Sequence, residues 1–294
     1  MAHKSGFVNI VGNPNVGKST LMNAMIGERL SIITSKAQTT RHRIQGIVST
    51  DDYQVVFSDT PGVLKPNYKL QESMLAQSRS ALVDADILLY VTDVLETTTK
   101  NQDFIDEVNK LEVPMLLILN KIDLASPEQL QLKINDMKLL FPKAEVICIS
   151  ALHGANISWL LDKIIELLPE GPPYFDKGEI TDRNMRFFVS EIIREKILLL
   201  YKEEIPYSCE VGIEEYKESP KIDRIRAIVY VIRDSQKGII IGDKGNMIKK
   251  LGIESRKEIE KFIGKQIFLD LYVKVDPDWR DKERSLLRFG YINK

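Results

Sequence analysis

The chain has 294 residues, of which 44% are hydrophobic and 28% charged, so it resembles a globular protein of about two domains. It has no apolar run of the ~20 residues that a membrane-spanning helix needs, no signal-peptide pattern, and only two cysteines, too few for a disulfide framework or a zinc site. A reducing cytosolic setting fits best, and the formal net charge of −1 for the whole chain says nothing for or against a nucleic-acid partner.

Residues 1–170 alternate between two kinds of segment. Short, nearly continuous apolar runs predict strands that are buried on both faces of a sheet, at 7–12, 54–59, 86–93, 114–120 and 144–150. Helical stretches lie between them, at 18–27, 69–85, 101–111 and 157–168. This alternation predicts a doubly wound α/β domain with a mainly parallel sheet.

The first helix is preceded by "GNPNVGKST", residues 12–20, which matches the phosphate-loop pattern G-x-x-x-x-G-K-[ST] between a strand and a helix. Backbone amides of such a loop surround phosphates, Lys18 contributes a positive charge, and the Ser19 hydroxyl is a ligand for Mg²⁺. The alternative is a glycine turn with an incidental lysine. The predicted nucleotide-binding residues here are Gly12, Asn13, Pro14, Asn15, Val16, Gly17, Lys18, Ser19 and Thr20.

The segment "KAQTTRHRI", residues 36–44, lies between the first helix and the next strand. A threonine there can complete Mg²⁺ coordination when a γ-phosphate is present and withdraw after hydrolysis, as an order–disorder switch. We choose Thr40 over Thr39, because Thr-Arg recurs in related GTPases. The alternative is a solvated polar loop. His42, like His3 and His153, is expected at the surface.

"DTPG", residues 59–62, follows a strand. Asp59 can hold a metal-bound water and the Gly62 amide can meet a γ-phosphate, with Thr60 and Pro61 between them. Ras-like proteins place a water-orienting glutamine next, whereas this chain has Val63, so intrinsic hydrolysis is expected to be slow. Asn15 resembles the asparagine that binds K⁺ in cation-assisted relatives lacking that glutamine; the alternative for it is a loop-stabilising hydrogen bond.

"NKID", residues 120–123, and "ISA", residues 149–151, end two further strands. The Asp123 carboxylate can accept hydrogen bonds from guanine N1–H and its exocyclic amine, which adenine cannot offer in the same way, and the Ala151 amide can reach the guanine carbonyl. Ligands of such sheets gather at the carboxyl ends of strands, where all these motifs fall. The ordered set predicts a GTP site that includes Asn120, Lys121, Asp123, Ser150 and Ala151.

Residues 168–182 hold three prolines and two glycines, and we interpret 171–182 as a flexible linker to a second domain, 183–294, with a C-terminal tail. That domain is predicted to have a helix at 186–205, strands at 208–218, 222–234 and 266–276, and a helix ending at Phe262. Residues 221–274 carry 13 basic and 7 acidic side chains, a local positive charge.

This positive region is centred on a second glycine loop, "GDKG", residues 242–245, which lacks the pattern of a phosphate loop. A G-x-x-G loop is how KH modules clamp single-stranded RNA backbone. The predicted RNA-binding residues are Ile241, Gly242, Asp243, Lys244, Gly245, Lys249 and Lys250, with Ile239, Ile240, Met247 and Ile248 as further groove walls. The alternative is a helix-joining turn with a solvated basic face.

The five nucleotide motifs in this order, "QTTRH" and "GDKG" together resemble the Era family, bacterial Ras-like GTPases with a C-terminal type II KH domain, over essentially all 294 residues. The resemblance implies a monomeric GTPase with Lys18, Thr40 and Gly62 as catalytic residues and Mg²⁺ held by Ser19, Thr40 and, through water, Asp59. It also implies binding to the 3′ end of 16S rRNA during 30S subunit maturation, and cytoplasmic localisation with peripheral association to the inner membrane surface.

Two alternatives remain at this stage. One is an RNA-binding chaperone that keeps its nucleotide only as a structural ligand. The other is a GTPase acting on tRNA or membranes, with the C-terminal module as a protein-docking platform. For the Era-like function, we expect the γ-phosphate to order 31–43 and to leave the RNA groove open, so that RNA and GTP strengthen each other's binding.

Overall fold

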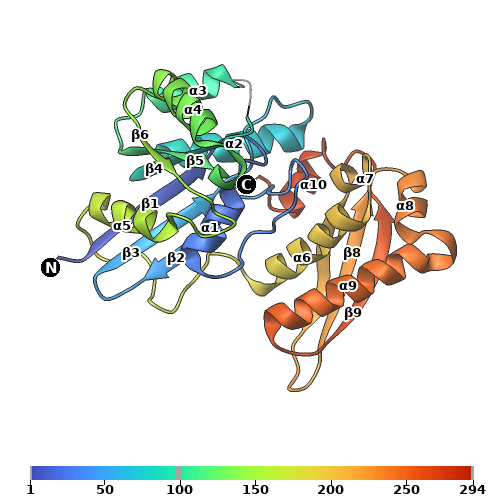
Figure 1. Ribbon diagram of the computed structural model, residues 1–294. Helices are drawn as coiled ribbons and strands as arrows, with labels where there is room; N and C mark the ends of the chain where they lie inside the picture. The colour runs from blue at the N-terminus through green and yellow to red at the C-terminus, as the bar shows by residue number, and fades with distance from the viewer. Residues whose placement is uncertain (1, 97–100, 293–294) are drawn as a thin grey trace. The chain divides into compact units, whose positions relative to one another are not determined.

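A computed structural model describes residues 2–96 and 101–292 (Figure 1). The chain divides into two compact units, and the boundary between them falls between Asp182 and Arg183. The short stretch Tyr68–Leu70 groups with the second unit, although the residues on either side of it belong to the first. In the part of the chain that the structure describes, no helix is long and apolar enough to cross a membrane.

The first unit is built on a six-stranded sheet in the order β2-β3-β1-β4-β5-β6. Every neighbouring pair is parallel except β2 and β3. The strands are β1 (Lys4–Val11), β2 (Ile44–Ser49), β3 (Tyr53–Asp59), β4 (Ile87–Asp93), β5 (Met115–Asn120) and β6 (Glu145–Cys148). The inner strands are buried almost throughout because helices cover both faces, and their sequences are therefore nearly continuous apolar runs.

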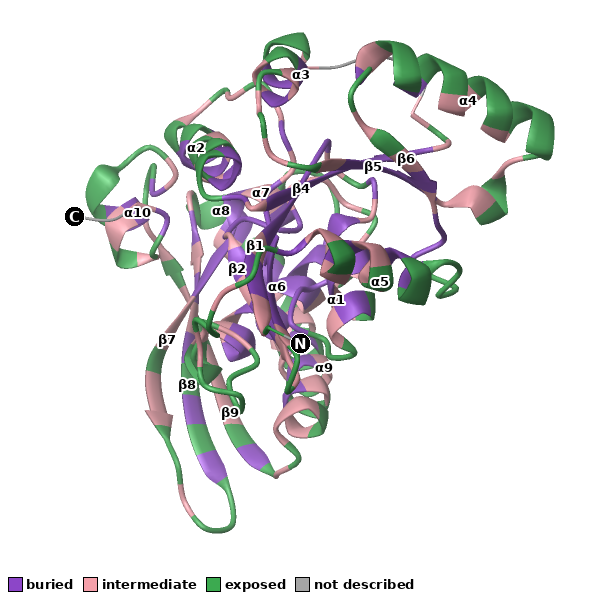
Figure 2. Cartoon of the chain, turned by 90° about the vertical axis from the view of Figure 1, so that its left-hand side faces the viewer, coloured by how far each residue is buried: buried purple, intermediate pink, exposed green. Residues whose placement is uncertain are grey.

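The helices of this unit form two layers (Figure 1). They are α1 (Lys18–Ile26), α2 (Lys69–Val83), α3 (Gln102–Asn109), α4 (Pro127–Leu140) and α5 (Ile157–Leu167). Helices α2, α3 and α4 share one core cluster, which includes Leu82, Phe104 and Met137, while α1 packs with α5 on the other face. Figure 2 shows the strands of this sheet as mostly buried and α4 as exposed along most of its length. The predicted mainly parallel α/β domain is confirmed.

The proline-rich segment 171–182 is part of the first unit rather than a free linker. It lies along the outer side of β2, where Ile47 N donates a 2.9 Å hydrogen bond to Ile180 O and Gln45 N donates one of 3.0 Å to Asp182 Oδ1. Gln54 of β3 donates to Phe175 O at 2.8 Å. These bonds pair the edge of the sheet, so the flexibility expected of this segment does not agree with its hydrogen bonding.

The second unit combines a three-stranded sheet with helices. It contains α6 (Met185–Leu200), α7 (Ile205–Ser208), β7 (Glu210–Lys217), β8 (Asp223–Val231), α8 (Asp234–Ile241), α9 (Asn246–Ile263), β9 (Ile267–Val275) and α10 (Glu283–Arg288). Strand β8 lies in the middle, antiparallel to β7 and parallel to β9. Because β8 and β9 are joined through α8 and α9, this is the strand and helix order of a type II KH domain, as predicted.

One face of this sheet packs against the long helices. Ile225, Ala227 and Val229 alternate along β8 and are buried in a cluster that also contains Ile193 of α6 and Ile259 of α9. The alternate residues of β9 from Ile267 to Val275 join the same cluster, which is the face predicted from their period of two. The opposite side of β8 and β9 is more exposed (Figure 2).

Candidate functional site

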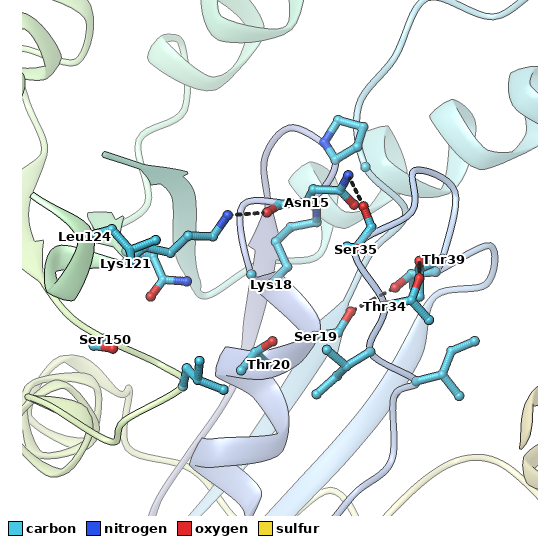
Figure 3. A pocket seen from close by; sticks show the side chains of 18 of the residues that line it. Asn15, Lys18, Ser19, Thr20, Thr34, Ser35, Thr39, Lys121, Leu124 and Ser150 are labelled. Carbon is cyan, nitrogen blue, oxygen red and sulfur yellow. Dashed lines mark hydrogen bonds between the residues drawn. The ribbon is translucent and has the colours of Figure 1, made fainter. Parts of the chain in front are cut away.

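A cavity of about 620 Å³ opens in the first unit, where the loops after β1, β3, β5 and β6 meet. Parallel strands bring their carboxyl ends to one edge of a sheet, and segments far apart in the sequence therefore converge there. Figure 3 shows Lys18, Ser19 and Thr20 between Lys121 and Ser150 on one side and Thr34, Ser35 and Thr39 on the other. The predicted nucleotide residues that line the cavity are Pro14, Asn15, Gly17, Lys18, Ser19, Thr20, Thr40, Gly62, Asn120, Lys121, Asp123 and Ser150.

Other predicted nucleotide residues do not line this cavity. They are Gly12, Asn13, Val16, Asp59, Thr60, Pro61 and Ala151. Thr60 Oγ1, for example, donates to Ile10 O at 2.7 Å, and Val16 is only 2% exposed. The cavity is also lined by Gln38 and Thr39, which belong to the predicted switch segment but were not chosen as ligands. Residues outside the motifs line it too, namely Ile32, Ile33, Thr34, Ser35, Leu124, Leu152 and His153.

Lys18 is buried, and its ammonium group donates to the backbone oxygens of Gly12 at 3.0 Å and Asn13 at 2.8 Å. Burial lowers the pKa of this lysine to about 8, partly offset by the carboxylates of Asp59 and Glu96. The ammonium group is therefore bound to the backbone at the start of the phosphate loop. This is the position from which a P-loop lysine reaches β- and γ-phosphate oxygens.

Three oxygen-bearing side chains converge below the loop. Ser19 Oγ donates to Asp59 Oδ2 at 2.6 Å and lies 2.8 Å from Thr40 Oγ1, which is 3.4 Å from the same carboxylate oxygen. Asp59 Oδ1 is buried and has no hydrogen-bond partner among the described residues. Burial raises the pKa of Asp59, and a cation bound beside it would favour its ionised form. Hydroxyl and carboxylate oxygens suit Mg²⁺, so the residues fit this ion.

The two adjacent threonines of the switch segment have different hydrogen-bond partners. The Thr40 hydroxyl points to Ser19 and Asp59, whereas Thr39 Oγ1 donates to Lys36 O and lies 2.6 Å from Thr34 Oγ1. This geometry agrees with the choice of Thr40 as the metal ligand.

The base-recognition residues form a connected group. Ser150 Oγ donates to Asp123 Oδ1 at 2.5 Å, and Lys121 Nζ donates to Asn15 O at 2.7 Å. Asn120 bridges two loops, since its Nδ2 donates to Val16 O at 2.9 Å and its Oδ1 accepts from the Ala151 amide at 3.0 Å. The Ala151 amide was expected to face the guanine carbonyl. In the structure it donates to Asn120 Oδ1, and the contact with guanine stays a prediction.

One prediction about exposure was wrong. His42 was expected at the surface, but it is only 7% exposed, because the chain leads directly from it into buried β2. Val63, which replaces the water-orienting glutamine, is 2% exposed and belongs to the core cluster of α2, α3 and α4. His3 is partly buried and hydrogen-bonds Gly171 O, while the ring of His153 is exposed, 3.7 Å from Asp123 Oδ2.

In the second unit, Gly242–Gly245 forms a tight turn between α8 and α9. Gly242 has φ 72°, and a Cβ there would lie 2.6 Å from Met247 Cγ, so any other residue would collide with the helix that follows. Asp243, Lys244, Lys249 and Lys250 are exposed, while Ile241 is half-buried. The turn therefore presents backbone and two pairs of neighbouring polar side chains to solvent, as an RNA-backbone clamp requires.

The apolar residues before this turn do not all face the groove. Ile240 is completely buried in the core of the unit, and its carbonyl accepts a 2.8 Å hydrogen bond from the Tyr201 hydroxyl. Its prediction as a groove wall was wrong, because in helix α8 successive residues point in different directions. Ile239, by contrast, is 48% exposed.

Fold and site together define a P-loop GTPase joined to a KH domain, and the family models agree. Residues 7–121 match the model described as 50S ribosome-binding GTPase, and residues 204–280 match that described as KH domain. The chain is 43% identical over 292 residues to GTPase Era of Staphylococcus epidermidis, covering 99% of this chain and 98% of the relative. It is 44% identical over 294 residues to GTPase Era of Carboxydothermus hydrogenoformans, with 99% of both chains covered. The chain belongs to the Era family of GTPases.

Solved structures agree over the whole length. The chain matches a crystal structure of Era in complex with MgGDPNP and nucleotides 1506–1542 of 16S ribosomal RNA, with a TM-score of 0.94, 38% identity and coverage of 99% of this chain and 100% of that one. A variant of Aquifex aeolicus Era bound to GDP·AlF4⁻ matches with the same values. The predicted family, fold and GTPase activity are thereby confirmed.

Proposed function

We propose that this GTPase is a nucleotide-controlled switch that acts on the 3′ end of 16S rRNA during assembly of the 30S subunit. The observation that carries the proposal is the presence, in one chain, of a cavity lined by the P-loop, switch and base-recognition motifs and of an exposed G-x-x-G turn with Lys244, Lys249 and Lys250 beside it. The similarity to an Era chain solved with MgGDPNP and a 16S rRNA fragment supports it.

In the nucleotide site, each group has a distinct task. Lys18 would place its charge against the β- and γ-phosphate oxygens, and Ser19, Thr40 and Asp59 are the residues that would hold Mg²⁺. When bound there, the ion would supply positive charge to the phosphates. The Gly62 amide, which lines the cavity, donates to the γ-phosphate.

K⁺ is a candidate second cation in this site. Asn15 Nδ2 donates to Ser35 O at 3.0 Å, which leaves the Oδ1 atom of the same amide as a ligand near the switch segment. Val63, the residue directly after Gly62, is buried and does not line the cavity, and a cation at Asn15 would supply part of the missing charge stabilisation.

In the KH unit, the turn at Gly242 lets an RNA backbone approach, and the lysines pair with its phosphates. Crosslinking followed by sequencing of the bound RNA tests the assignment. Recovery of the 3′ end of 16S rRNA supports it, whereas recovery of tRNA or of no defined RNA would favour the protein-docking alternative. Multiple-turnover GTP hydrolysis would exclude a purely structural nucleotide.

The place of action follows from the substrate. Assembly of 30S subunits takes place in the cytoplasm, which we therefore propose as the location, with peripheral association to the inner membrane surface as an additional property. Co-sedimentation with vesicles of anionic and of neutral lipids tests the second part, and equal absence from both pellets would contradict it.

A further inference from the structure

A line of polar side chains runs behind the phosphate loop. Thr92 Oγ1 donates to Glu96 Oε2 at 2.7 Å, and Asn13 Nδ2 donates to Glu96 Oε1 at 2.5 Å. Asn101 Nδ2 then donates to Asn13 Oδ1 at 2.8 Å and also to the backbone oxygen of Val63 at 2.9 Å. Asn101 therefore joins the phosphate loop to the segment that follows "DTPG".

The peptide units around Val63 are attached at three points. Val63 N donates to Gly12 O at 3.1 Å, its side chain is buried in the core cluster, and its carbonyl accepts from Asn101. On the other side, Gly62 lies directly on the phosphate loop, since a Cβ there would be 2.7 Å from two atoms of Pro14. The Gly62 amide is thus fixed relative to the loop that holds the phosphates.

Asn101 stands at the N-terminus of a helix but does not use its side chain to cap that helix. It precedes helix α3 with φ 58°, and asparagine is the non-glycine residue that best tolerates this left-handed conformation. An asparagine at a helix N-terminus commonly caps the helix with its side chain, but Asn101 makes no such cap. Both hydrogens of its amide nitrogen are used on Asn13 and Val63 instead.

We propose that Asn101 is a positioning residue for GTP hydrolysis, which fixes the Gly62–Val63 backbone so that the Gly62 amide points at the γ-phosphate. Hydrogen-bond donors that already point to the place where negative charge develops stabilise the transition state more than the ground state. The Gly62 backbone would supply such a donor next to Val63, whose buried side chain does not line the cavity. The inference rests on the GTPase activity of the family and is independent of the RNA assignment.

Two substitutions test the role of the amide. Asn101→Gly keeps the left-handed backbone accessible and removes both donors. Asn101→Asp keeps the shape but places a carboxylate against Val63 O and Asn13 Oδ1. If the Asn13 amide turns to donate to the new carboxylate, its oxygen then faces Glu96, and the contact of the carboxylate with Val63 O persists in either orientation. The matched control is Asn109→Ala, on the same helix, where Nδ2 donates to Leu140 O at 2.9 Å and the residue does not line the cavity.

The measurements are kcat and KM for GTP, the Kd for GDP and for a non-hydrolysable GTP analogue, and the melting temperature of each full-length variant. We expect Asn101→Gly to lower kcat about fivefold to tenfold and Asn101→Asp to lower it further, with the Kd for GDP within about twofold of wild type. The analogue, which carries a γ-phosphate, should lose more affinity than GDP. Asn109→Ala should leave kcat unchanged, whatever its effect on melting temperature.

Two results would overturn the proposal. One is an unchanged kcat in a folded Asn101→Gly variant. The other is an equal loss of affinity for GDP and for the analogue, since that would make Asn101 a general support of the loop. Wild-type hydrolysis is measured in the same series, and its absence would count against the GTPase function rather than against the role of Asn101.

Discussion

The Ser150 hydroxyl donates a 2.5 Å hydrogen bond to Asp123 Oδ1 and thereby fixes a carboxylate that lines the cavity, with His153 Nε2 3.7 Å from its second oxygen. These residues come from the ends of different strands, β6 and β5, and meet only because the strands are adjacent and parallel. Guanine presents two donors to such a carboxylate, and adenine does not. Specificity for the base thus depends on one carboxylate and the hydroxyl that orients it.

Replacement of this carboxylate should change the base that is preferred. In the wild-type protein, GTP and GDP should bind about 10⁴-fold more tightly than ATP, because adenine does not offer the Asp123 carboxylate the two donors that guanine does. Asp123→Asn replaces one acceptor by a donor and should shift the preference toward xanthine nucleotides. Competition assays with fluorescent GDP measure both effects, and comparable wild-type affinities for GTP and ATP would contradict guanine recognition.

The dependence of GDP affinity on pH should show how Ser150 contributes to base binding. Its hydroxyl is the main cause that holds the pKa of Asp123 below the usual 3.8, so the carboxylate stays ionised to lower pH. As pH falls through that lowered pKa, Asp123 takes up a proton and loses an acceptor for guanine. In Ser150→Ala the pKa returns toward its usual value, and the affinity for GDP should begin to fall at a higher pH. Superimposable pH profiles of GDP affinity for the two proteins would contradict this.

The Thr40 hydroxyl should strengthen nucleotide binding only when the nucleotide carries a γ-phosphate. Thr40→Ala removes a hydroxyl from the group around Ser19 and Asp59, and we expect the affinity for a Mg²⁺-bound GTP analogue to fall about fivefold to tenfold with little change for GDP. Thr39→Ala is the matched control, because the Thr39 hydroxyl bonds Lys36 and Thr34 instead. Removal of Mg²⁺ with a chelator should abolish the difference between wild type and Thr40→Ala. An equal loss for GDP would show that Thr40 does not sense the γ-phosphate.

Potassium should accelerate hydrolysis if Asn15 holds a cation. The rate in KCl should exceed that in NaCl at equal ionic strength by about tenfold, and Asn15→Ala should remove that difference. Equal rates in the two salts would leave Asn15 with the hydrogen bond to Ser35 as its only role.

Much of this site could be predicted from the sequence because each motif follows a strand. Apolar runs of four to eight residues located β1, β3, β4, β5 and β6, and parallel pairing then brought Lys18, Asp59 and Asp123 to one edge. The KH order was likewise visible in the strands and helices around Gly242.

The features that were missed depend on contacts between distant residues. Pairing of Gly46 with Thr181 attaches 171–182 to β2, but a proline-rich composition indicates only a break in regular structure. Asn101 meets Asn13 across 88 residues, through side-chain amides that create no periodic pattern. The inward orientation of Ile240 was hidden because the run of isoleucines is apolar on every face.

The central claim, that the nucleotide controls RNA binding, is tested most directly by the affinity of the full-length protein for a 16S rRNA 3′-end fragment at fixed salt, with GDP and with a non-hydrolysable GTP analogue. We expect about fivefold to 150-fold tighter RNA binding with the analogue, and RNA should strengthen analogue binding by the same factor. Gly242→Asp combined with Lys244→Asp should remove the RNA effect and leave intrinsic hydrolysis intact. Equal RNA affinities in the two nucleotide states would contradict the switch and leave a GTPase and an RNA-binding domain that act independently.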